Sequence, residues 1–114
     1  MLIKGLTPEV IDSEFSEDDR AWVVSEEGTD SLLVVPDPRY AEPVVQFFMK
    51  LEDAQQYALD VKEENENLKD KNLQPKSIKL KETMRAVMGA EPPCAVILHS
   101  PNAMYEYFRD RGEG

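Results

Sequence analysis

Among its 114 residues the sequence has one cysteine, one histidine and five glycines, and each shortage argues against a class of site. Cys94 has no second cysteine with which to form an intramolecular disulfide, and together with His99 it cannot complete the ligand set of a zinc ion. The glycines are scattered, so no Gly-rich loop is available to hold a phosphate group. We therefore expect neither a metal nor a cofactor, and we interpret Cys94 as a small buried apolar residue.

Long hydrophobic runs are also missing. No segment approaches the ~20 apolar residues that a membrane-spanning helix needs. The first residues contain no apolar stretch of signal-peptide length, because Glu9, Asp12 and Glu14 closely follow the opening Met1–Gly5. The sequence therefore predicts a protein of a reducing, cytoplasmic compartment, without a membrane span.

Basic residues are few compared with acidic ones: 13 against 23, which gives a formal net charge of −10. The excess acid is concentrated in two clusters, Glu14–Asp19 and Glu26–Asp30. Binding to nucleic acid requires a stripe of cationic side chains that displaces phosphate counterions, and the sequence has none. We therefore expect no nucleic-acid partner. An acidic surface favours a basic partner, although the need for solubility also accounts for it.

The length and composition indicate one domain. A chain of 114 residues, 41% of them hydrophobic, can bury one core but not two independent ones. We therefore expect a single α+β domain spanning residues 1–114. The two ends, Met1–Thr7 and Arg111–Gly114, have few apolar anchors and are expected to fray.

The spacing of apolar residues alternates between strand-like and helix-like. Runs rich in β-branched and aromatic residues predict strands at residues 21–25, 31–35, 43–49, 77–80 and 95–99, the first two forming a hairpin. Apolar positions three and four residues apart predict helices at residues 8–15, 51–71, 80–88 and 101–108. This order predicts a mixed, partly antiparallel sheet of about five strands, with helices packed mainly on one of its faces.

Only one pair of side chains suggests catalysis, the adjacent His99 and Ser100. Adjacent residues rarely point at each other, and Ser100 followed by Pro101 is typical of a helix N-cap. We therefore interpret His99 as a histidine at the end of a strand and expect that the protein is not an enzyme. The alternative, a small enzyme, would place His99 beside a carboxylate in a cleft.

The predicted long helix allows a second interpretation, pairing with another helix. Its apolar face also fits a heptad pattern in which Asn65 occupies a core position that can set the register of paired helices. The residues concerned are Leu51, Ala54, Ala58, Val61, Asn65 and Leu68. Because the pattern is short and includes alanines, packing of this helix on the chain's own sheet is the favoured reading.

The junction between the third predicted strand and this helix resembles a known family. Phe47–Ala54 followed by Tyr57-Ala58 is similar to the repeated element of the small intermembrane-space subunit of the chloroplast protein-import translocon and its cyanobacterial relatives. In outline the resemblance extends from about Trp22 to Phe108. It implies a non-catalytic, chaperone-like protein, accessory to protein transport, in the periplasm or plastid intermembrane space. It also implies an apolar peptide-binding groove beside the sheet, formed between two modules and hence restored here by a homodimer.

We predict a protein-binding module whose partner is another protein or a second copy of the chain. The expected contact residues are aromatic groups that do not all fit inside a small core: Tyr40, Trp22, Phe47, Phe48, Tyr105 and Tyr107. Tyr40 is the strongest candidate for a surface contact because it follows a proline-rich loop. The alternative is an acidic regulator or inhibitor of the phage or mobile-element type, which would occlude a basic site with Glu14–Asp19 and Glu26–Asp30. Salt would weaken this occlusion of a basic site far more than it would weaken binding through the aromatic residues.

Overall fold

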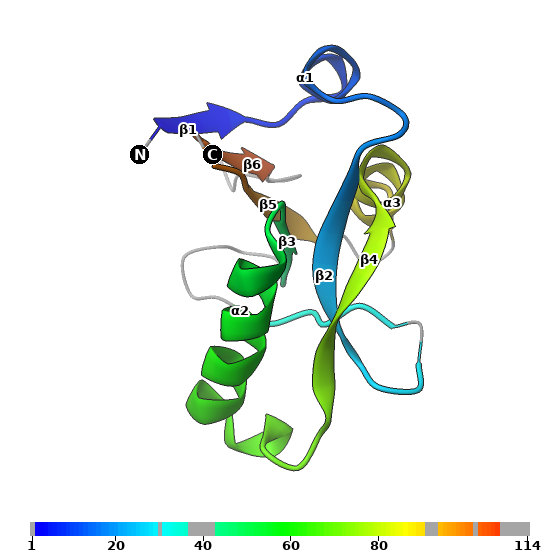
Figure 1. Ribbon diagram of the computed structural model, residues 1–114. Coiled ribbons are helices and arrows are strands. Elements are labelled where there is room, and N and C mark those ends of the chain that lie inside the picture. The colour runs from blue at the N-terminus through cyan, green and yellow to red at the C-terminus, as the bar shows by residue number, and fades with distance from the viewer. Residues whose placement is uncertain (1, 30, 37–42, 91–93, 102, 108–114) are drawn as a thin grey trace.

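The computed structural model describes residues 2–29, 31–36, 43–90, 94–101 and 103–107, which contain three α-helices and one six-stranded sheet (Figure 1). The strand order is β1-β6-β5-β3-β2-β4. The strands are β1 (Leu2–Gly5), β2 (Arg20–Glu26), β3 (Val44–Phe48), β4 (Leu73–Lys79), β5 (Ala95–His99) and β6 (Ala103–Tyr107). The pairs β1/β6 and β3/β5 are parallel and the others antiparallel. The predicted mixed α+β fold is confirmed, with six strands rather than about five.

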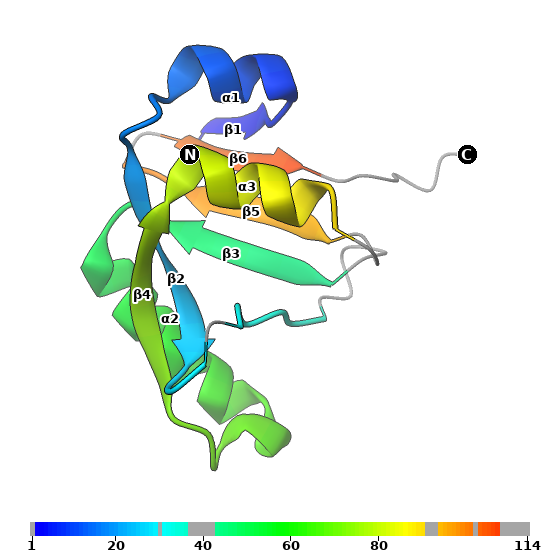
Figure 2. The ribbon, with the colours of Figure 1, turned by 90° about the vertical axis from the view of Figure 1, so that its right-hand side faces the viewer.

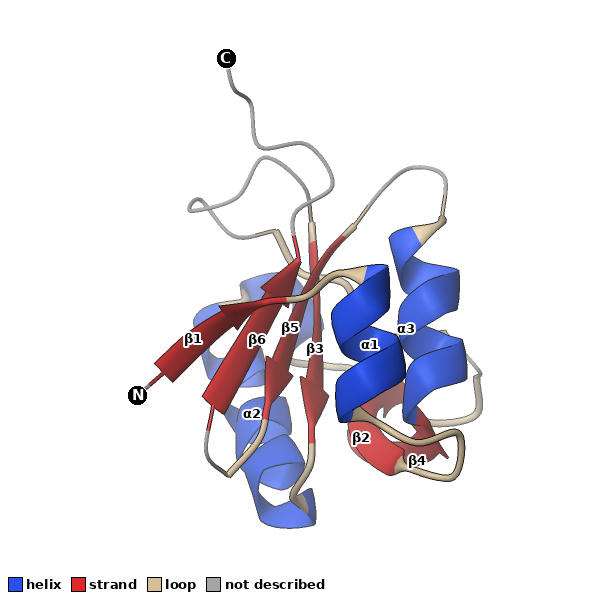
Figure 3. Ribbon diagram, turned by 90° about the horizontal axis from the view of Figure 1, so that it is seen from above, coloured by secondary structure: helices blue, strands red, loops and turns tan. Residues whose placement is uncertain are grey.

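The helices cover both faces of this sheet. Helices α1 (Pro8–Glu14) and α3 (Leu80–Met88) lie next to each other on one face, and α2 (Leu51–Glu64) lies on the other (Figure 3). A short 3-10 helix, η1 (Glu66–Leu68), follows α2 and leads into β4 at the far end of the molecule (Figure 2). Two of the three α-helices therefore share a face, and α2 has the opposite face to itself.

The pleat of β3 assigns its side chains to these two faces. Val45 and Phe47 belong to the main core with residues of α3, β5 and β6, which places them under α1 and α3. Gln46 and Phe48 alternate with them and so face α2. β3 thus contributes Val45 and Phe47 to the core on one face of the sheet, and Gln46 and Phe48 to the face that α2 covers.

Several local predictions are confirmed. Helix α1 begins as its sequence indicates: the Thr7 hydroxyl accepts a hydrogen bond from the Val10 amide at 3.2 Å, and Pro8 occupies the first turn. Helix α3 ends at Gly89, whose amide donates to the Arg85 carbonyl at 3.1 Å. The apolar strand at residues 95–99 has the predicted bounds.

The predicted hairpin of 21–25 with 31–35 is only partly formed: the two segments share one antiparallel bridge and a hydrogen bond from the Leu33 amide to the Val24 carbonyl at 2.8 Å. Residues 31–35 make only isolated bridges, Ser25 with Leu32 and Val35 with Val44. The long antiparallel partner of β2 is instead β4, paired along its whole length. β4 begins before the predicted residue 77 and contains Pro75, which is tolerated because β4 lies at the edge of the sheet.

The predicted C-terminal helix is also wrong, because residues 103–107 form strand β6 between β1 and β5. Ser100 closes the turn that connects β5 to β6 rather than capping a helix. Its hydroxyl donates to the Ala103 carbonyl at 2.7 Å and accepts from the Ala103 amide at 3.3 Å. The same Ser-Pro signal serves a hairpin because antiparallel pairing of β6 with β5 buries Ala103 and Tyr105.

Two boundaries differ from the prediction. Leu2–Gly5 does not fray, because it pairs in parallel with β6 as strand β1. Helix α2 ends at Glu64 rather than near residue 71: the backbone amide and the side-chain amide of Asn65 both donate to the Val61 carbonyl, at 3.1 and 2.9 Å. Residues 111–114, the other end expected to fray, lie outside the described residues.

Candidate functional site

Most of the aromatic residues expected to contact a partner lie in or against the core. Phe47 is fully buried and Tyr105 is 6% exposed, both in the cluster under α1 and α3. Tyr107 is half-buried against the same cluster. Tyr40 lies outside the described residues. The structure therefore does not gather these residues on one accessible surface.

Trp22 and Phe48, the other two expected contact residues, are neighbours on the α2 face. They are register partners across β2 and β3, with Trp22 half-buried and Phe48 buried. The Phe48 ring is tilted against Tyr57 of α2, with a centroid distance of 5.3 Å. It also stacks on the imidazole of His99 at 4.7 Å, nearly parallel to it. Phe48 therefore connects α2, β3 and β5.

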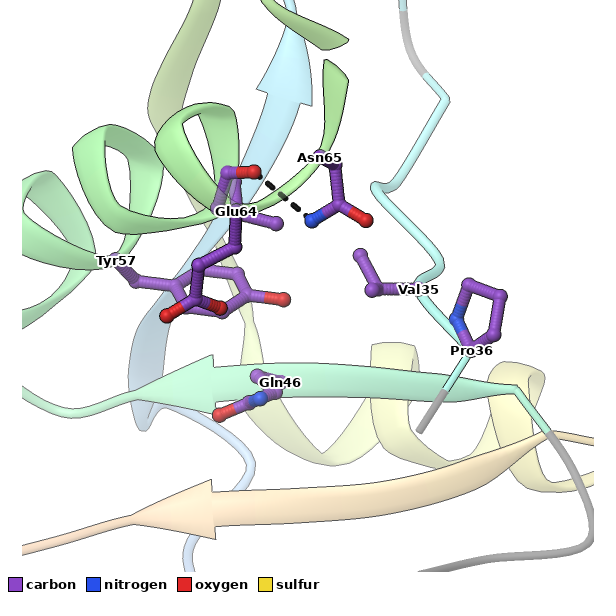
Figure 4. A pocket seen from close by; sticks show the side chains of 7 residues that line it. Val35, Pro36, Gln46, Tyr57, Glu64 and Asn65 are labelled. Carbon is purple, nitrogen blue, oxygen red and sulfur yellow. Dashed lines mark hydrogen bonds between the residues drawn. The ribbon is translucent and has the colours of Figure 1, made fainter. Parts of the chain in front are cut away.

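Two adjoining hollows run along the side of α2 that faces β3. The first has a volume of about 370 Å³ and is lined by Gln46, Phe48, Asp53, Gln56, Tyr57, Asp60 and His99. The second has a volume of about 250 Å³ and is lined by Val35, Pro36, Gln46, Tyr57, Val61, Glu64 and Asn65 (Figure 4). Gln46 and Tyr57 line both hollows, so the two lie side by side, and we call them together the α2 groove.

The helical repeat explains why α2 presents polar groups to this groove. Asp53, Tyr57, Asp60 and Glu64 are spaced four, three and four residues apart, which places them along one side of the helix. This stripe lies beside the buried residues that hold α2 on the sheet, Ala54, Ala58 and Val61. The small alanines allow a close approach of helix and sheet, so the long polar side chains line the border between them.

Figure 4 shows how side chains from three segments enclose the second hollow. Tyr57 and Glu64 extend from α2 toward Gln46, which lies on β3. Val35 and Pro36 form the opposite wall. The groove therefore has an apolar side, a polar floor and an acidic rim.

His99 lies in the first hollow, held by two contacts. Its Nε2 atom is 2.7 Å from Oε1 of Gln46. Because an amide oxygen only accepts hydrogen bonds, Nε2 carries the proton in this arrangement. Burial lowers the pKa of His99 from the ordinary value of 6.5, and the nearby Asp53 carboxylate opposes that shift. The imidazole is therefore neutral at pH 7.

The charged residues that line the groove all have the same sign. Asp53, Asp60 and Glu64 are acidic, and none of the described residues that line the two hollows is a lysine or arginine. Within the described part of the chain these three carboxylates form no ion pair. Asp60 accepts a hydrogen bond from the Gln56 side chain at 2.9 Å, which orients its carboxylate. Among the described residues, the groove lining thus carries negative charge without a basic side chain beside it.

The acidic cluster near α1 has a different environment. Glu17 is 3.1 Å from Nζ of Lys81, and Asp12 is 3.6 Å from the same atom. Arg85 pairs with both carboxylates as well. Asp19 accepts a hydrogen bond from the Ser16 amide at 2.9 Å. These acids hold the α1 region against α3 instead of leaving a free anionic surface.

The groove lining offers carboxylates, amides and aromatic rings, and Asp53 and Asp60 line the same hollow as His99. The hydrogen-bond partner of His99 is an amide, which does not accept a proton as a carboxylate would. Among the described residues, no group of three or more His, Cys, Asp or Glu side chains is arranged to hold a metal ion. Cys94 is half-buried ahead of β5, outside the groove lining. The α-helices in the described ranges are too short or too polar to span a bilayer.

Sequence reasoning missed most of the groove residues. Gln46 carried a signal, because it is the one polar residue within the apolar run Val44–Phe48. The stripe of Asp53, Tyr57 and Asp60 carried another, because it repeats at helical spacing beside the apolar face. What the sequence could not supply was the strand that faces this stripe, since parallel pairing brings His99 of β5 opposite Phe48 of β3 from far along the chain.

Comparisons with known proteins add no relative. No protein-family model matches the chain, and neither the curated protein sequences nor the solved structures give a significant match.

Proposed function

We propose that the chain is a non-catalytic protein-binding module and that its partner binds as an extended segment in the α2 groove. The observation that carries this proposal is that the two hollows adjoin along α2 and share Gln46 and Tyr57 in their linings. A long, open depression between a helix and a sheet suits an extended chain better than a small molecule, which is usually enclosed in one deep pocket. Amide and carboxylate groups along it can hydrogen-bond a peptide backbone and its polar side chains.

A chaperone-like role, accessory to protein transport, fits the same groove. The resemblance of Phe47–Tyr57 to the import-translocon subunit implies a groove beside the sheet, and the α2 groove lies there. Its lining differs from the implied apolar one, because carboxylates and amides alternate with Tyr57 and Phe48. We therefore propose selection of polar, charged segments rather than capture of exposed apolar ones.

Charge favours a different protein over a second copy of this chain as the partner. The chain has a net charge of −10, so two copies repel each other, and the acidic groove adds to that repulsion. The second candidate function, occlusion of a basic site by Glu14–Asp19 and Glu26–Asp30, finds less support. Glu17 is neutralised by Lys81 and Arg85, and Glu26 lies 3.8 Å from Lys71.

A peptide selection tests this proposal without knowledge of the natural partner. A library of random dodecapeptides displayed on phage would be selected on the purified full chain. Each selected peptide would then be titrated into ¹⁵N-labelled protein. We expect the largest amide shift changes at Gln46, Tyr57 and Asn65. Largest changes at residues 14–19 would overturn the proposal in favour of the acidic regulator, and a selection that yields no binding peptide would also overturn it.

A matched pair of variants on α2 provides the control. Tyr57→Ala removes the ring that both hollows share, whereas Leu59→Ala truncates a side chain that is 61% exposed on the same helix and lines neither hollow. We expect the first to weaken binding of a selected peptide about ten-fold or more and the second to leave it unchanged, since buried aromatic contacts dominate interfaces. Melting temperatures of both variants confirm that each remains folded during the measurement.

A further inference from the structure

The first hollow of the α2 groove, around Tyr57 and His99, is lined by both planar rings and carboxylates. This combination suits a particular kind of side chain in the bound segment. Asp53 and Asp60 flank Tyr57, four residues before it and three after it on the same side of α2. At the helical rise, their backbones are displaced by about 6 Å and about 4.5 Å from that of Tyr57 along the axis. A cation placed over the Tyr57 ring would therefore lie between the two carboxylates along the helix axis, in the negative field of both.

The opposite wall of this hollow is also aromatic and uncharged. His99 stacks on Phe48 with an interplanar angle of 4° and a centroid distance of 4.7 Å, and this pair of parallel rings lines the hollow that Tyr57 also borders. His99 donates its Nε2 proton to Gln46, and burial lowers its pKa so that the ring is neutral at pH 7. A neutral imidazole does not repel a cation, and the aromatic faces attract one.

From this geometry we infer that the hollow bordered by Asp53, Tyr57, Asp60 and His99 is a receptor for the guanidinium group of an arginine in the bound segment. The inference rests on the proposed peptide-binding function and names the side chain that the groove selects. Charge complementarity identifies a cation, since the lining includes two carboxylates and none of its described residues is basic.

Planarity distinguishes arginine from lysine. A guanidinium is flat and weakly hydrated, stacks on aromatic rings and donates several hydrogen bonds at once to carboxylates and amide oxygens. An ammonium is compact and strongly hydrated, so it gains less from the Phe48–His99 unit and the Tyr57 ring. Gln56 holds the carboxylate of Asp60 through a 2.9 Å hydrogen bond, which fixes one of the acceptors in advance.

A set of three peptides tests the inference directly. Acetylated and amidated Ala-Ala-Gly-Arg-Gly-Ala-Ala would be titrated into the ¹⁵N-labelled chain at low salt, alongside the same peptide with citrulline or lysine in place of arginine. Citrulline keeps the shape of arginine and removes the charge. We expect the arginine peptide to bind about ten-fold more tightly than the citrulline peptide and several-fold more tightly than the lysine peptide.

Isosteric variants locate the site. Asp53→Asn and Asp60→Asn should each weaken the arginine peptide about three-fold to five-fold, as expected for partly exposed ion pairs, and leave the citrulline peptide unchanged. Glu63→Gln is the matched control, because it removes the same charge from an exposed position of α2 that lines neither hollow. If all three variants weaken binding of the arginine peptide equally, the peptide responds only to the net negative charge of the protein, and the inference is overturned.

The outcomes also separate this inference from the proposed function. If the arginine and citrulline peptides bind equally and shift the Gln46 and Tyr57 amides, the guanidinium receptor is refuted while the groove remains a peptide site. If library-selected peptides bind in the groove without arginine, the same conclusion follows. If no peptide shifts the groove amides, both proposals fail. If the lysine peptide binds more tightly than the arginine peptide, the inferred guanidinium receptor is refuted, and the hollow is a receptor for an ammonium group.

Discussion

Lys81 offers a quantitative test of what holds α1 against α3. Its side chain is only 7% exposed, yet its ammonium group reaches Asp12 and Glu17, whose side chains are 63% and 70% exposed. The lysine stem is thus buried in the protein, while the charge meets its partners near solvent. Two contributions to stability are therefore separable, burial of the stem and pairing of the charge.

The two contributions differ in size. Lys81→Ala removes the Cγ, Cδ and Cε methylenes, each contributing about 0.8 kcal/mol when buried, or about 2.4 kcal/mol together. Pairs with exposed carboxylates contribute about 0.2–1 kcal/mol each. We therefore expect Lys81→Ala to lower the free energy of unfolding by about 3 kcal/mol. Lys81→Met keeps a chain of similar volume and loses only the pairing, so it should cost about 1 kcal/mol or less.

Urea unfolding followed by circular dichroism measures both variants, provided that the denaturant dependence stays constant. Lys69→Ala serves as the control, since Lys69 forms an ion pair with Glu66 in which both side chains are largely exposed, and it should cost no more than about 0.5 kcal/mol. If Lys81→Met were as damaging as Lys81→Ala, charge pairing rather than stem burial would hold the two helices together. If Lys81→Ala lowers the free energy of unfolding by less than about 1 kcal/mol, burial of the Lys81 stem does not stabilise the protein.

Two further predictions concern the opposite sides of β3 and β5. Phe47→Ala should lower the free energy of unfolding by about 3–5 kcal/mol, because the ring is fully buried, whereas Leu59→Ala should change it by less than about 0.5 kcal/mol in the same urea titration. His99 should titrate below 6.5 by NMR, because burial lowers its pKa in the folded state. As the pH falls, the unfolded chain therefore takes up a proton on His99 before the folded chain does. The contribution of His99 to the free energy of unfolding is complete above pH 6.5 and is lost as the pH falls through the folded-state pKa. The loss is at most about 1.4 kcal/mol per pH unit. In a His99→Gln variant the free energy of unfolding should change less between pH 7.5 and 5.5 than in the unchanged protein. An equally large change would refute the attribution of this pH dependence to His99.

The parts of the fold that could be predicted from sequence are those decided by local chemistry. Thr7-Pro8 starts α1 because a hydroxyl cap and a fixed proline φ suffice, whatever lies elsewhere in the chain. The apolar run at residues 95–99 becomes a central strand because β-branched and aliphatic residues with no polar interruption require cover on both faces. In each case the deciding interaction lies within a few residues.

The errors arose where distant pairing decided the outcome. Ser100-Pro101 suits a helix start and a hairpin turn equally, and only the pairing of β6 with β1 and β5 selects the hairpin. Residues 31–35 have strong strand propensity, but they make a single bridge to β2, Ser25 with Leu32, while β4 is the strand that pairs along the length of β2. Propensity is a weak guide in such cases because strand stability depends on the neighbours.

The same limit applied to the candidate site. Aromatic residues were expected to form a contact surface, and yet Phe47 and Tyr105 are in the core because their strands are central or flanked on both sides. The groove is instead built by the polar residues between them. Gln46 was visible as an exception within its strand, but its partner His99 lies 53 residues away, brought close only by the parallel register of β3 and β5.

Strand β3 shows why stability and recognition can be separated in so small a protein. Its pleat sends Val45 and Phe47 into the core and Gln46 toward the groove, so adjacent residues serve different purposes. We expect a substitution at Gln46 to leave the packing under α1 and α3 intact, because Gln46 points to the opposite face of the sheet from Val45 and Phe47. Phe48 and Val61 are exceptions, since both are buried and also line the groove. The proposed recognition surface therefore shares Phe48 and Val61 with the packing of α2 on the sheet, whereas substitutions of its exposed residues, such as Asp53 and Asp60, should not unfold the domain.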